Sequence, residues 1–569
     1  MIQSATSDRL PRSIFTLAIA TCLLVTPASA ELFSKAAAPR APKLVVQITV
    51  DQLRGDLPMR YRGRLPKGGF RYLLEQGTHY VNAHYDHANT ETAVGHATLV
   101  TGADPSRHGI VGNDWIDPKT GAFVYNTEDE RHTLIGKEPK AHQGVSPRNL
   151  LGSTIGDELV LSNAGQSRVF SISGKDRGAI LPGGHAGKAF WYSKSSGEFV
   201  TSTYYYDAYP KWVATWNAAK PVDRYRGKKW ELSQPHEDYI AKDLDDRPYE
   251  ADFGDLGRTF PHDYGDGKYF TLIVGLTPAV DELTLDFAKK LIQEEKLGAG
   301  EATDFLALSF SATDYVGHLF GPSSLESEDN ILRLDRVLAS LFAFLDKTVG
   351  LKNTLIILSA DHGGPEAPEY ASSIGIEAGR FSFDHFKKPN ELTAALKERY
   401  GRDDFILSHS HPYLYLNYDA IRDAKQDPAQ VERFIAAEAT KISGIRFAMS
   451  RSELLEGRYV DAPLQRQIRR NFHPDRSGGI HLVQDQYWFL HSTDEAAKMG
   501  LTGLAAIHGS PWSYDTYVPI FFAGHKVPAQ TIARRVSITD VAPTIAIYLG
   551  IKQPSGAMGN PLEEVFGRD

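Results

Sequence analysis

Six side chains of the kinds that bind metal ions lie beside apolar segments of this 569-residue chain. They are Asp51, Asp314, His318, Asp361, His362 and His508. Carboxylate oxygens and neutral imidazole nitrogens suit zinc or a similar divalent ion. One tetrahedral site uses fewer donors, so two metal ions that share a substrate or water are the economical interpretation. Each residue alone also has an ordinary role, as a helix cap or as one member of an i, i+4 pair.

The candidate nucleophile is Thr92, which is predicted to open a helix that runs toward Val100. A hydroxyl at a helix N-terminus faces the positive end of the helix dipole and free N–H groups, which favour an alkoxide and a bound anion. On residue chemistry alone, a plain helix N-cap is the more ordinary role for this threonine. The nucleophile role requires a metal ion beside the hydroxyl to lower its pKa.

The elements that must position these residues are apolar runs separated by helical patterns. Leu44–Val50 is continuously apolar and rich in β-branched residues, which is typical of a buried parallel strand. Similar runs cover residues 305–310, 354–358 and 517–522, although Pro519 weakens the last as a central strand. The alternation predicts an α/β fold with a central, largely parallel sheet flanked by helices. Ligands of such sheets gather beyond the carboxyl ends of the strands.

Start and stop residues predict several helices. Thr277-Pro278 is a favourable N-cap and N1 pair, and an amphipathic helix is expected over residues 325–349. Thr539 and Gly550 are expected to begin and end a helix near the C-terminus. Residues of about 180–265 and 366–505 break the strand–helix alternation. We expect both to be insertions that form a cap on a single catalytic domain over residues 31–569.

Composition narrows the class of protein. The apolar fraction of 42% is ample for a core and excludes disorder as the main state. The 62 Lys and Arg residues against 70 Asp and Glu residues give a net charge of −8. This mixed, mildly acidic charge argues against nucleic acid or an anionic membrane surface as the main partner.

Residues 1–30 read as a secretory signal peptide. Arg9 and Arg12 precede an apolar run over residues 14–25, and Ala28-Ser29-Ala30 has the form of a cleavage site. The run is shorter than the roughly 20 residues that span a bilayer. The only cysteine, Cys22, would leave with the signal, so we expect an exported protein without disulfides, in a bacterial periplasm. The alternative is an uncleaved N-terminal anchor; no other segment is expected to span a membrane.

Several longer stretches resemble one family. They are VDQLRGD (50–56), GGFRYLLEQG (68–77), TGADPSRHGIVGNDW (101–115), GKDRGAILPGGH (174–185) and RSGGIHLV (476–483). Together with the order of the candidate ligands and Thr92, they resemble the alkaline phosphatase superfamily, in its PafA-like branch. This branch shares a domain type with nucleotide pyrophosphatases/phosphodiesterases. The resemblance covers most of residues 44–550.

The resemblance implies a role for each candidate. One zinc ion would be held by Asp314, His318 and His508. The other would be held by Asp51, Asp361 and His362 together with the Thr92 oxygen. The implied reaction is hydrolysis of phosphate monoesters through a covalent phospho-threonine intermediate.

The choice between monoester and diester depends on the groups that contact the non-bridging phosphate oxygens. Monoesterases of this branch use an Asn, a Lys and an Arg, which match Asn113, Lys175 and Arg177 here. The charge of two divalent ions, +4, is offset by three carboxylates and an alkoxide, −4 in total. The Lys and the Arg then give the site a net charge of about +2, which suits a phosphate monoester dianion. In this branch the Lys also occupies the space that a third, magnesium site fills in other alkaline phosphatases, so the resemblance implies no catalytic magnesium. The alternative is that Lys175 and Arg177 flank Asp176 in a surface ion network.

Other activities of the superfamily fit less well. The segment 92–96 lacks the C/S-x-P-x-R frame of sulfatases, and the mutases match only the general metal pattern. A phosphodiesterase or nucleotide pyrophosphatase on the same scaffold is the first alternative. A catalytically inactive phosphate- or metal-binding protein is the second. Small phosphate monoesters are the expected partners, and a monomer is the expected state.

Overall fold

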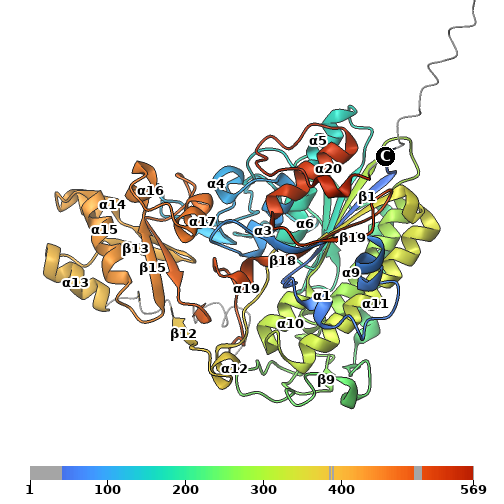
Figure 1. Cartoon of the computed structure of the whole chain (residues 1–569), viewed down its shortest axis with the longest axis horizontal. Coiled ribbons are helices and arrows are strands. Elements are labelled where there is room, and N and C mark those ends of the chain that lie inside the picture. Colours follow the sequence, from blue (N-terminus) through green and yellow to red (C-terminus); the bar gives the residue numbers. More distant parts are fainter. Residues whose placement is uncertain (1–40, 383–385, 387–389, 492–502, 568–569) are drawn as a thin grey trace, which may run out of the picture. The chain divides into compact units, whose positions relative to one another are not determined.

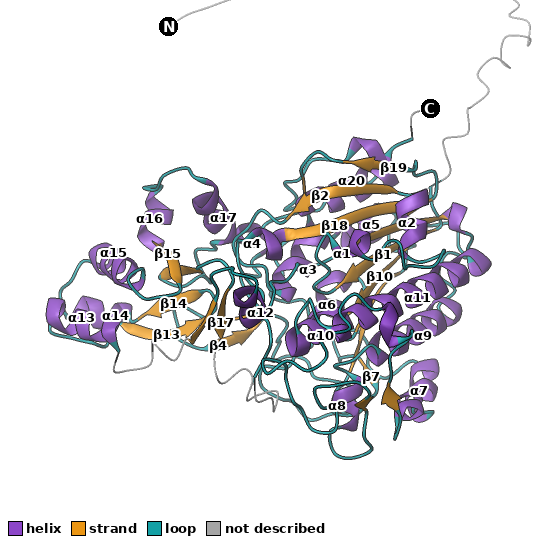
Figure 2. Ribbon diagram, turned by 60° about the horizontal axis from the view of Figure 1, so that its bottom comes forward, coloured by secondary structure: helices purple, strands orange, loops and turns teal. Residues whose placement is uncertain are grey.

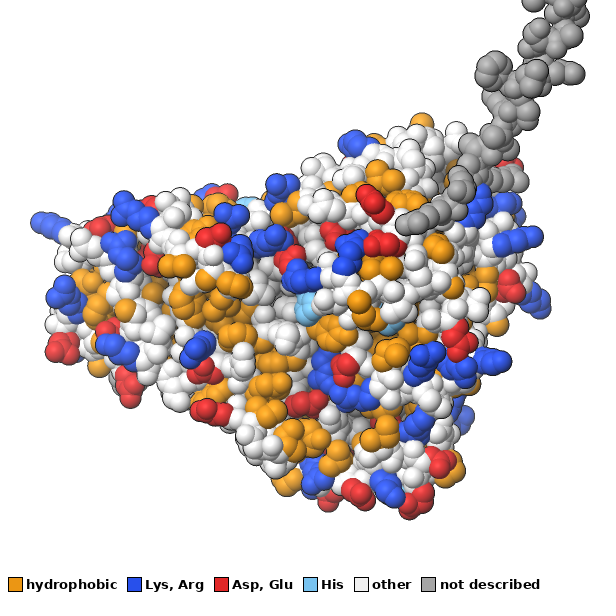
Figure 3. Space-filling view, in the orientation of Figure 1, with side chains coloured by type: hydrophobic (Ala, Val, Ile, Leu, Met, Phe, Trp, Pro, Cys, Tyr) orange, Lys and Arg blue, Asp and Glu red, His pale blue; other side chains and the backbone are white. Residues whose placement is uncertain are grey.

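The computed structural model describes residues 41–382, 386, 390–491 and 503–567. The predicted signal peptide and Cys22 lie outside the described residues. None of the helices within the described ranges combines the length and the apolar character needed to cross a membrane. Acidic and basic side chains alternate over the face seen in Figure 3, in keeping with the mixed charge of the sequence.

A ten-stranded sheet forms the centre of the main body (Figures 1 and 2). Its strand order is β19-β2-β18-β11-β1-β10-β5-β6-β7, with β20 paired to β2. The strands are β1 (Leu44–Val50), β2 (Thr78–His84), β5 (Val169–Ser173), β6 (Lys188–Tyr192), β7 (Phe199–Val200), β10 (Asp304–Phe310), β11 (Thr354–Ser359), β18 (Tyr517–Gly524), β19 (Gln530–Ile532) and β20 (Val536–Ser537). The central pairs β1–β10, β1–β11, β10–β5 and β5–β6 are parallel, which confirms the predicted fold class.

Strand β18 departs from the parallel pattern. It lies between β11 and β2 and is antiparallel to both. The register with β2 shifts between Val518 and Ile520, so Pro519 occupies an irregularity where no ladder hydrogen bond is required. A proline is therefore tolerated in a strand that is central in the sheet.

Helices flank this sheet (Figure 1). The helices that surround the sheet or lie in the loops near it are α1 (Leu57–Arg60), α2 (Phe70–Gln76), α3 (Thr92–Thr101), α4 (Pro105–His108), α5 (Ile155–Ser162), α6 (Asp176–Gly183), α7 (Lys211–Ala218), α8 (Phe270–Val274), α9 (Ala279–Glu294), α10 (Ala312–Phe320), α11 (Leu325–Thr348), α19 (Ser513–Thr516) and α20 (Val541–Leu549). Helix α12 (Pro368–Ser373) contacts β12 instead. Short two-stranded ribbons pair β3 (Asp114–Ile116) with β4 (Phe123–Tyr125) and β8 (Lys229–Trp230) with β9 (His262–Asp263).

Helix α11 matches the expected range, whereas two predicted caps are wrong. The N-cap of α9 is Pro278, and the Thr277 hydroxyl donates to the Val274 carbonyl instead of to the helix. Near the C-terminus, a short 3-10 turn over Ile538–Asp540 precedes α20, and Ser537 caps it in place of Thr539. Gly550 ends α20 in the left-handed region, at φ 66°.

A smaller sheet occupies the second predicted insertion. Strands β13 (Ile406–Ser410), β14 (Tyr413–Leu416), β15 (Ile445–Ser450) and β16 (Ile480–Gln484) form it, with helices α13 (Glu391–Tyr400), α14 (Tyr418–Asp423), α15 (Pro428–Ala439), α16 (Arg451–Glu456) and α17 (Pro463–Asn471). It packs on a separate hydrophobic cluster, and β12 (Gly379–Ser382) pairs with β17 (Trp488–His491) beside it. The first predicted insertion differs from expectation, because β6 and β7 within residues 180–265 extend the main sheet.

Candidate functional site

The candidate ligands meet beyond the carboxyl ends of the central strands β1, β10 and β11. Asp51 follows β1, Asp361 and His362 follow β11, and Asp314 lies in the first turn of α10, just after β10. Val50 of β1 is paired with Phe310 of β10, and Thr49 is paired with Ser359 of β11. The carboxyl ends of these parallel strands are therefore level, and the side chains beyond them converge.

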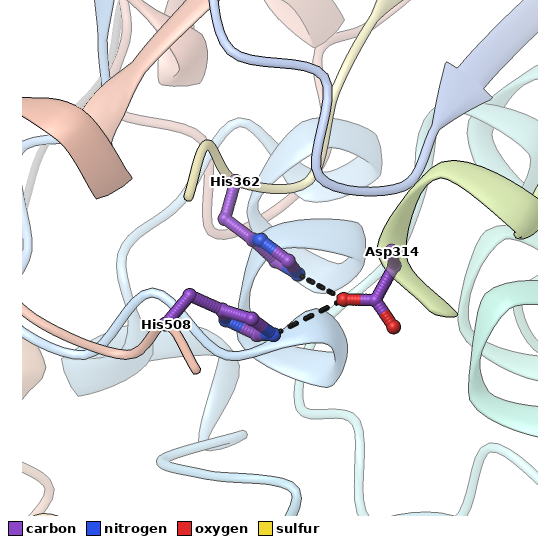
Figure 4. Close-up of side chains that lie close together, drawn as sticks. All are labelled: Asp314, His362 and His508. Atoms are coloured by element: carbon purple, nitrogen blue, oxygen red, sulfur yellow. Dashed lines mark ion pairs between the residues drawn. The ribbon is translucent and has the colours of Figure 1, made fainter. Parts of the chain in front are cut away.

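Two groups of side chains have atoms close enough to share a cation. One is Asp51, Asp361 and His362, and the other is Asp314, His362 and His508; within each, the ligand atoms lie within 4.8 Å of one another. His508 and His362 both point their Nε2 atoms at Asp314 Oδ1, at 3.2 and 3.9 Å (Figure 4). His318 Nε2 lies 3.1 Å from the same oxygen.

His362 belongs to both groups, whereas the family resemblance assigns it to one ion only. Its Nε2 lies 3.3 Å from Asp51 Oδ1 and 3.5 Å from Asp361 Oδ2, as that assignment requires. Its ring also stacks on His508, with ring centroids 3.4 Å apart, so it lies between the two groups. His318 approaches Asp314, but it is not in the compact second group.

Backbone carbonyls set the tautomer of all three histidines. His318 Nδ1 lies 2.8 Å from the Ala506 carbonyl, His362 Nδ1 lies 2.8 Å from that of Gly363, and His508 Nδ1 lies 2.9 Å from that of Thr90. An imidazole that donates from Nδ1 to a carbonyl keeps a lone pair on Nε2. Each Nε2 lone pair then faces carboxylate oxygens, so two hydrogen-bond acceptors oppose each other with no proton between them. A bound divalent cation resolves this arrangement, and these residues therefore fit a metal centre.

Burial and charge agree with this fit. Asp51, Asp361 and His362 are fully buried, and burial lowers the pKa of His508 to about 3. Burial and the Asp314 carboxylate would raise the pKa of Asp51, but Lys175 and His362 outweigh them and hold it below its ordinary range. Burial and the Asp51 carboxylate raise the pKa of Asp361 well above its usual value. Burial would lower the pKa of His318, but the Asp314 carboxylate raises it. Metal binding requires ionised carboxylates and neutral imidazoles, and a bound cation would lower both pKa values.

Thr92 is the first residue of α3, and the N-cap position belongs to Glu91. The Thr92 hydroxyl lies 3.5 Å from His362 Nε2. The alternative role of Thr92 as a plain N-cap therefore does not hold. The hydroxyl is buried at the positive end of the helix and faces the candidate ligands, which is the arrangement that a nucleophile needs.

The three predicted phosphate-binding side chains differ in how closely they contact the candidate ligands and α3. Lys175 is buried; its Nζ is 2.7 Å from Asp51 Oδ2 and also contacts Asp314. Asn113 Oδ1 accepts a 3.0 Å hydrogen bond from the Ala93 N–H, in the first turn of α3. Arg177 is partly buried, and its nearest carboxylate, that of Asp176, is 4.0 Å away.

The alternative of a surface K-D-R ion network does not describe these residues. Lys175 pairs with Asp51 and Asp314 inside the site, not with Asp176. The Asp176 carboxylate accepts from the Tyr125 hydroxyl at 2.8 Å and from the Arg177 backbone N–H. Arg177 is partly buried and is paired with Asp176 only at 4.0 Å, so its guanidinium keeps donors that could bind an anion.

Most of the other histidines take part in packing. His481 is buried in the smaller sheet, and His108 contacts the Thr98 hydroxyl at 3.1 Å. His96 is buried, and its Nε2 lies 3.5 Å from Oδ2 of the candidate ligand Asp361. His411, from the His409-Ser410-His411 tract, lies 2.9 Å from the Gly509 carbonyl and so touches the loop that carries a candidate ligand.

Sequence reasoning missed three residues that support the site. Gln52, with a positive φ of 64°, donates from its backbone N–H to Asp361 and from its side chain to Asp314. Asp515 Oδ2 accepts from the backbone of Gly509 and Ser510, which follow His508. Glu91 accepts from Asn113. The adjacency of Gln52 to Asp51 was a usable signal, whereas nothing in the sequence marks Asp515.

Comparisons with known proteins agree over nearly the whole chain. The family model described as type I phosphodiesterase / nucleotide pyrophosphatase matches residues 45–511. A Myroides odoratus protein named calcium-transporting ATPase is 39% identical over 532 residues, 92% of this chain and 95% of that protein. Alkaline phosphatase PafA of Elizabethkingia meningoseptica is 36% identical over 541 residues, 94% of this chain and 96% of that protein. A crystal structure of PafA superposes with a TM-score of 0.85 at 35% identity and covers 93% of this chain and all of that one.

Proposed function

The chain belongs to the type I phosphodiesterase / nucleotide pyrophosphatase family of the alkaline phosphatase superfamily, and from this premise we propose that it is an alkaline phosphatase. Its substrates are phosphate monoesters, which it hydrolyses to an alcohol and inorganic phosphate. The observation that carries the proposal is a pair of cations: Lys175, buried between the candidate metal ligands Asp51 and Asp314, and the partly buried Arg177 two residues further along the chain.

The two cations favour a dianion over a monoanion. The transition state of phosphoryl transfer from a monoester keeps its charge on the equatorial oxygens. Arg177 can hold two such oxygens through its planar guanidinium, and Lys175 acts as a point charge. A diester carries one negative charge and an additional ester group, so it gains less from both cations. The phosphodiesterase alternative predicts that these two side chains contribute little.

Thr92 is the nucleophile of the proposed reaction. Its Oγ forms a bond to phosphorus as the ester oxygen leaves with a proton as the alcohol. Water then attacks phosphorus, the P–Oγ bond breaks, and phosphate is released as the threonine hydroxyl is restored. Asn113, Lys175 and Arg177 hold the non-bridging oxygens through both steps.

We propose two zinc ions as the resident metals. Asp314, His318 and His508 would hold one, and Asp51, Asp361 and His362 the other. When bound, the ions would lower the pKa of the Thr92 hydroxyl and stabilise the negative charge of the leaving oxygen. Catalytic magnesium is not part of the proposal, since the Lys175 ammonium already lies between Asp51 and Asp314.

Export to a periplasm after cleavage at Ala30, and a monomeric state, complete the proposal. The name of the Myroides odoratus relative refers to calcium transport, which is not proposed for this chain. Activity toward ATP would be compatible with the site, because its hydrolysis is also a phosphoryl transfer to water.

The test is to trap the intermediate. The enzyme is mixed with p-nitrophenyl phosphate and quenched in acid, and the peptide that spans residue 92 is examined by mass spectrometry. One added phosphoryl group on Thr92 is expected. If the reaction is quenched during the pre-steady-state burst and this peptide is unmodified while another residue carries the phosphoryl group, the assignment of Thr92 is contradicted.

A further inference from the structure

Glu91 stands directly before the proposed nucleophile and has no role in the mechanism described above. Glu91 is the N-cap residue of α3, yet its carboxylate makes no capping hydrogen bond to that helix. It accepts three hydrogen bonds instead, from Asn89 Nδ2 at 2.9 Å, from the Asn113 backbone N–H at 3.0 Å and from Asn113 Nδ2 at 3.3 Å. Two of the three come from one residue, the proposed phosphate-binding asparagine.

The contacts of Asn113 define the orientation of its amide. Ala93, in the first turn of α3, donates its N–H to Asn113 Oδ1 at 3.0 Å, so the oxygen of the amide faces the helix. The nitrogen then faces Glu91 Oε1, which accepts one of its two N–H groups. A flipped amide would place N–H against N–H at Ala93 and oxygen against carboxylate at Glu91. One N–H of Nδ2 remains for a phosphoryl oxygen.

The loop is built to let this carboxylate approach. A Cβ atom on Gly112 would lie 3.0 Å from Glu91 Oε2 and 2.8 Å from the Asp114 carbonyl. Glycine therefore keeps space open beside the carboxylate where Asn113 donates its backbone N–H. The Asn113 carbonyl is held from the other side by Asn126, whose Nδ2 donates to it at 2.6 Å.

We infer that Glu91 is a positioning residue for the phosphoryl-transfer step, which it serves by holding the Asn113 amide with a single N–H directed at the substrate. The inference rests on the proposed function, in which Asn113 binds a non-bridging oxygen. Glu91 itself touches neither the substrate nor the reacting atoms. The geometry explains why a carboxylate is placed near an anion site: it accepts both Asn113 donors at once, which a single amide oxygen cannot do as well.

The test is a double-mutant cycle on the zinc-loaded, full-length mature enzyme, with Glu91→Ala, Asn113→Ala and the double variant. We expect Glu91→Ala to lower kcat/KM for p-nitrophenyl phosphate by ~10-fold and to add less than ~2-fold in the Asn113→Ala background. Zinc content and the unfolding midpoint should stay near wild type. Glu91→Gln, which retains one acceptor oxygen, should fall between wild type and Glu91→Ala and serves if the alanine variant does not fold.

A matched control is Glu432→Gln in α15, a helix that accompanies the smaller sheet. Glu432 is a buried carboxylate that accepts from the Tyr418 hydroxyl and from Ser452 at 2.8 and 2.7 Å, remote in sequence from the site. Its variant should lower the unfolding midpoint and leave kcat/KM unchanged. Equal losses from Glu91→Ala in both backgrounds would overturn the inference and leave the proposed function intact. No loss from Asn113→Ala would overturn the inference together with the phosphate-binding role of Asn113.

Discussion

The Nζ atom of Lys175 lies 2.7 Å from Asp51 Oδ2. The same ammonium contacts Asp314, so one cation joins a carboxylate from each candidate metal group. Burial would lower the pKa of Lys175, but the carboxylates of Asp314 and Asp51 raise it well above its usual value. The two carboxylates therefore favour the positively charged form of Lys175 between the two candidate metal groups.

The first prediction concerns this charge and its neighbour Arg177. Substituting both, as Lys175→Ala with Arg177→Ala, should lower kcat/KM for a phosphate monoester by ~10³-fold or more, because two charge-assisted contacts to the transition state are lost. The loss on a diester should be far smaller. Lys119→Ala, which removes an exposed lysine paired with Asp475 at the surface, is the matched control. Equal losses on both substrates would contradict the charge argument.

Thr92→Ala should abolish most steady-state hydrolysis, because no hydroxyl remains to accept the phosphoryl group. Zinc content and binding of inorganic phosphate should persist, since the other ligands and the cations are intact. Thr92→Ser should retain substantial activity. Thr101→Ala is a control in the same helix, where the hydroxyl donates to the Ala97 carbonyl and accepts from the Ala103 N–H, both backbone groups. Hydrolysis near the wild-type rate in Thr92→Ala would rule out the nucleophile assignment.

His508→Ala tests the metal assignment. Its Nε2 lies 3.2 Å from Asp314 Oδ1, and its loss removes one donor from one group while the Asp51–Asp361–His362 group stays complete. Metal analysis after dialysis should give about one zinc per chain in place of about two. His481→Ala, a buried histidine of the smaller sheet, should retain the wild-type content. Two retained ions in His508→Ala would remove this residue from the ligand set.

The pair of His185 and Asp157 predicts a pH dependence of stability away from the metal ligands. The two side chains are 3.0 Å apart. The hydrogen bond to Asp157 raises the pKa of His185. Burial would raise the pKa of Asp157, but the His185 contact and backbone donors lower it.

The signs of the two shifts define a window. A raised histidine pKa contributes stability at low pH that is lost as pH rises through the folded value, and a lowered aspartate pKa contributes stability that is lost as pH falls. The pair should therefore stabilise the folded protein between about pH 4 and pH 7. Its contribution to the free energy of unfolding should be less than about 1 kcal/mol, because His185 is partly exposed. Urea unfolding of wild type and His185→Gln should differ at about pH 5.5 and converge at about pH 8.5. An equal difference at both pH values would refute the pairing.

The sequence was most informative where burial dictates residue type. Strands β1, β10 and β11 are fully buried, so they read as continuous apolar runs, and the acids beyond their ends stand out. This contrast is why the candidate ligands could be named from the order of residues alone. The roles of Asn113, Lys175 and Arg177 came from family resemblance, because an isolated asparagine or a K-D-R segment has no distinctive pattern.

Other features depend on contacts that sequence does not display. Ser537 caps the turn before α20 because the chain turns one step earlier than the Thr539 signal suggests. His362 lies between both ligand groups because its ring stacks on His508, a residue far along the chain. Asp515 holds the His508 loop through backbone N–H groups, and such contacts leave no periodicity. Strand direction was likewise hidden for β18, which is apolar in either orientation.

The most direct test of the central claim is the ratio of kcat/KM for p-nitrophenyl phosphate to that for bis-p-nitrophenyl phosphate, measured on the purified zinc-loaded enzyme. The two cations, Lys175 and Arg177, predict a monoester preference of ~10³-fold or more. A ratio near or below one would mean that Lys175 and Arg177 do not face the phosphoryl oxygens, and that the same scaffold and ligand set serve a phosphodiesterase.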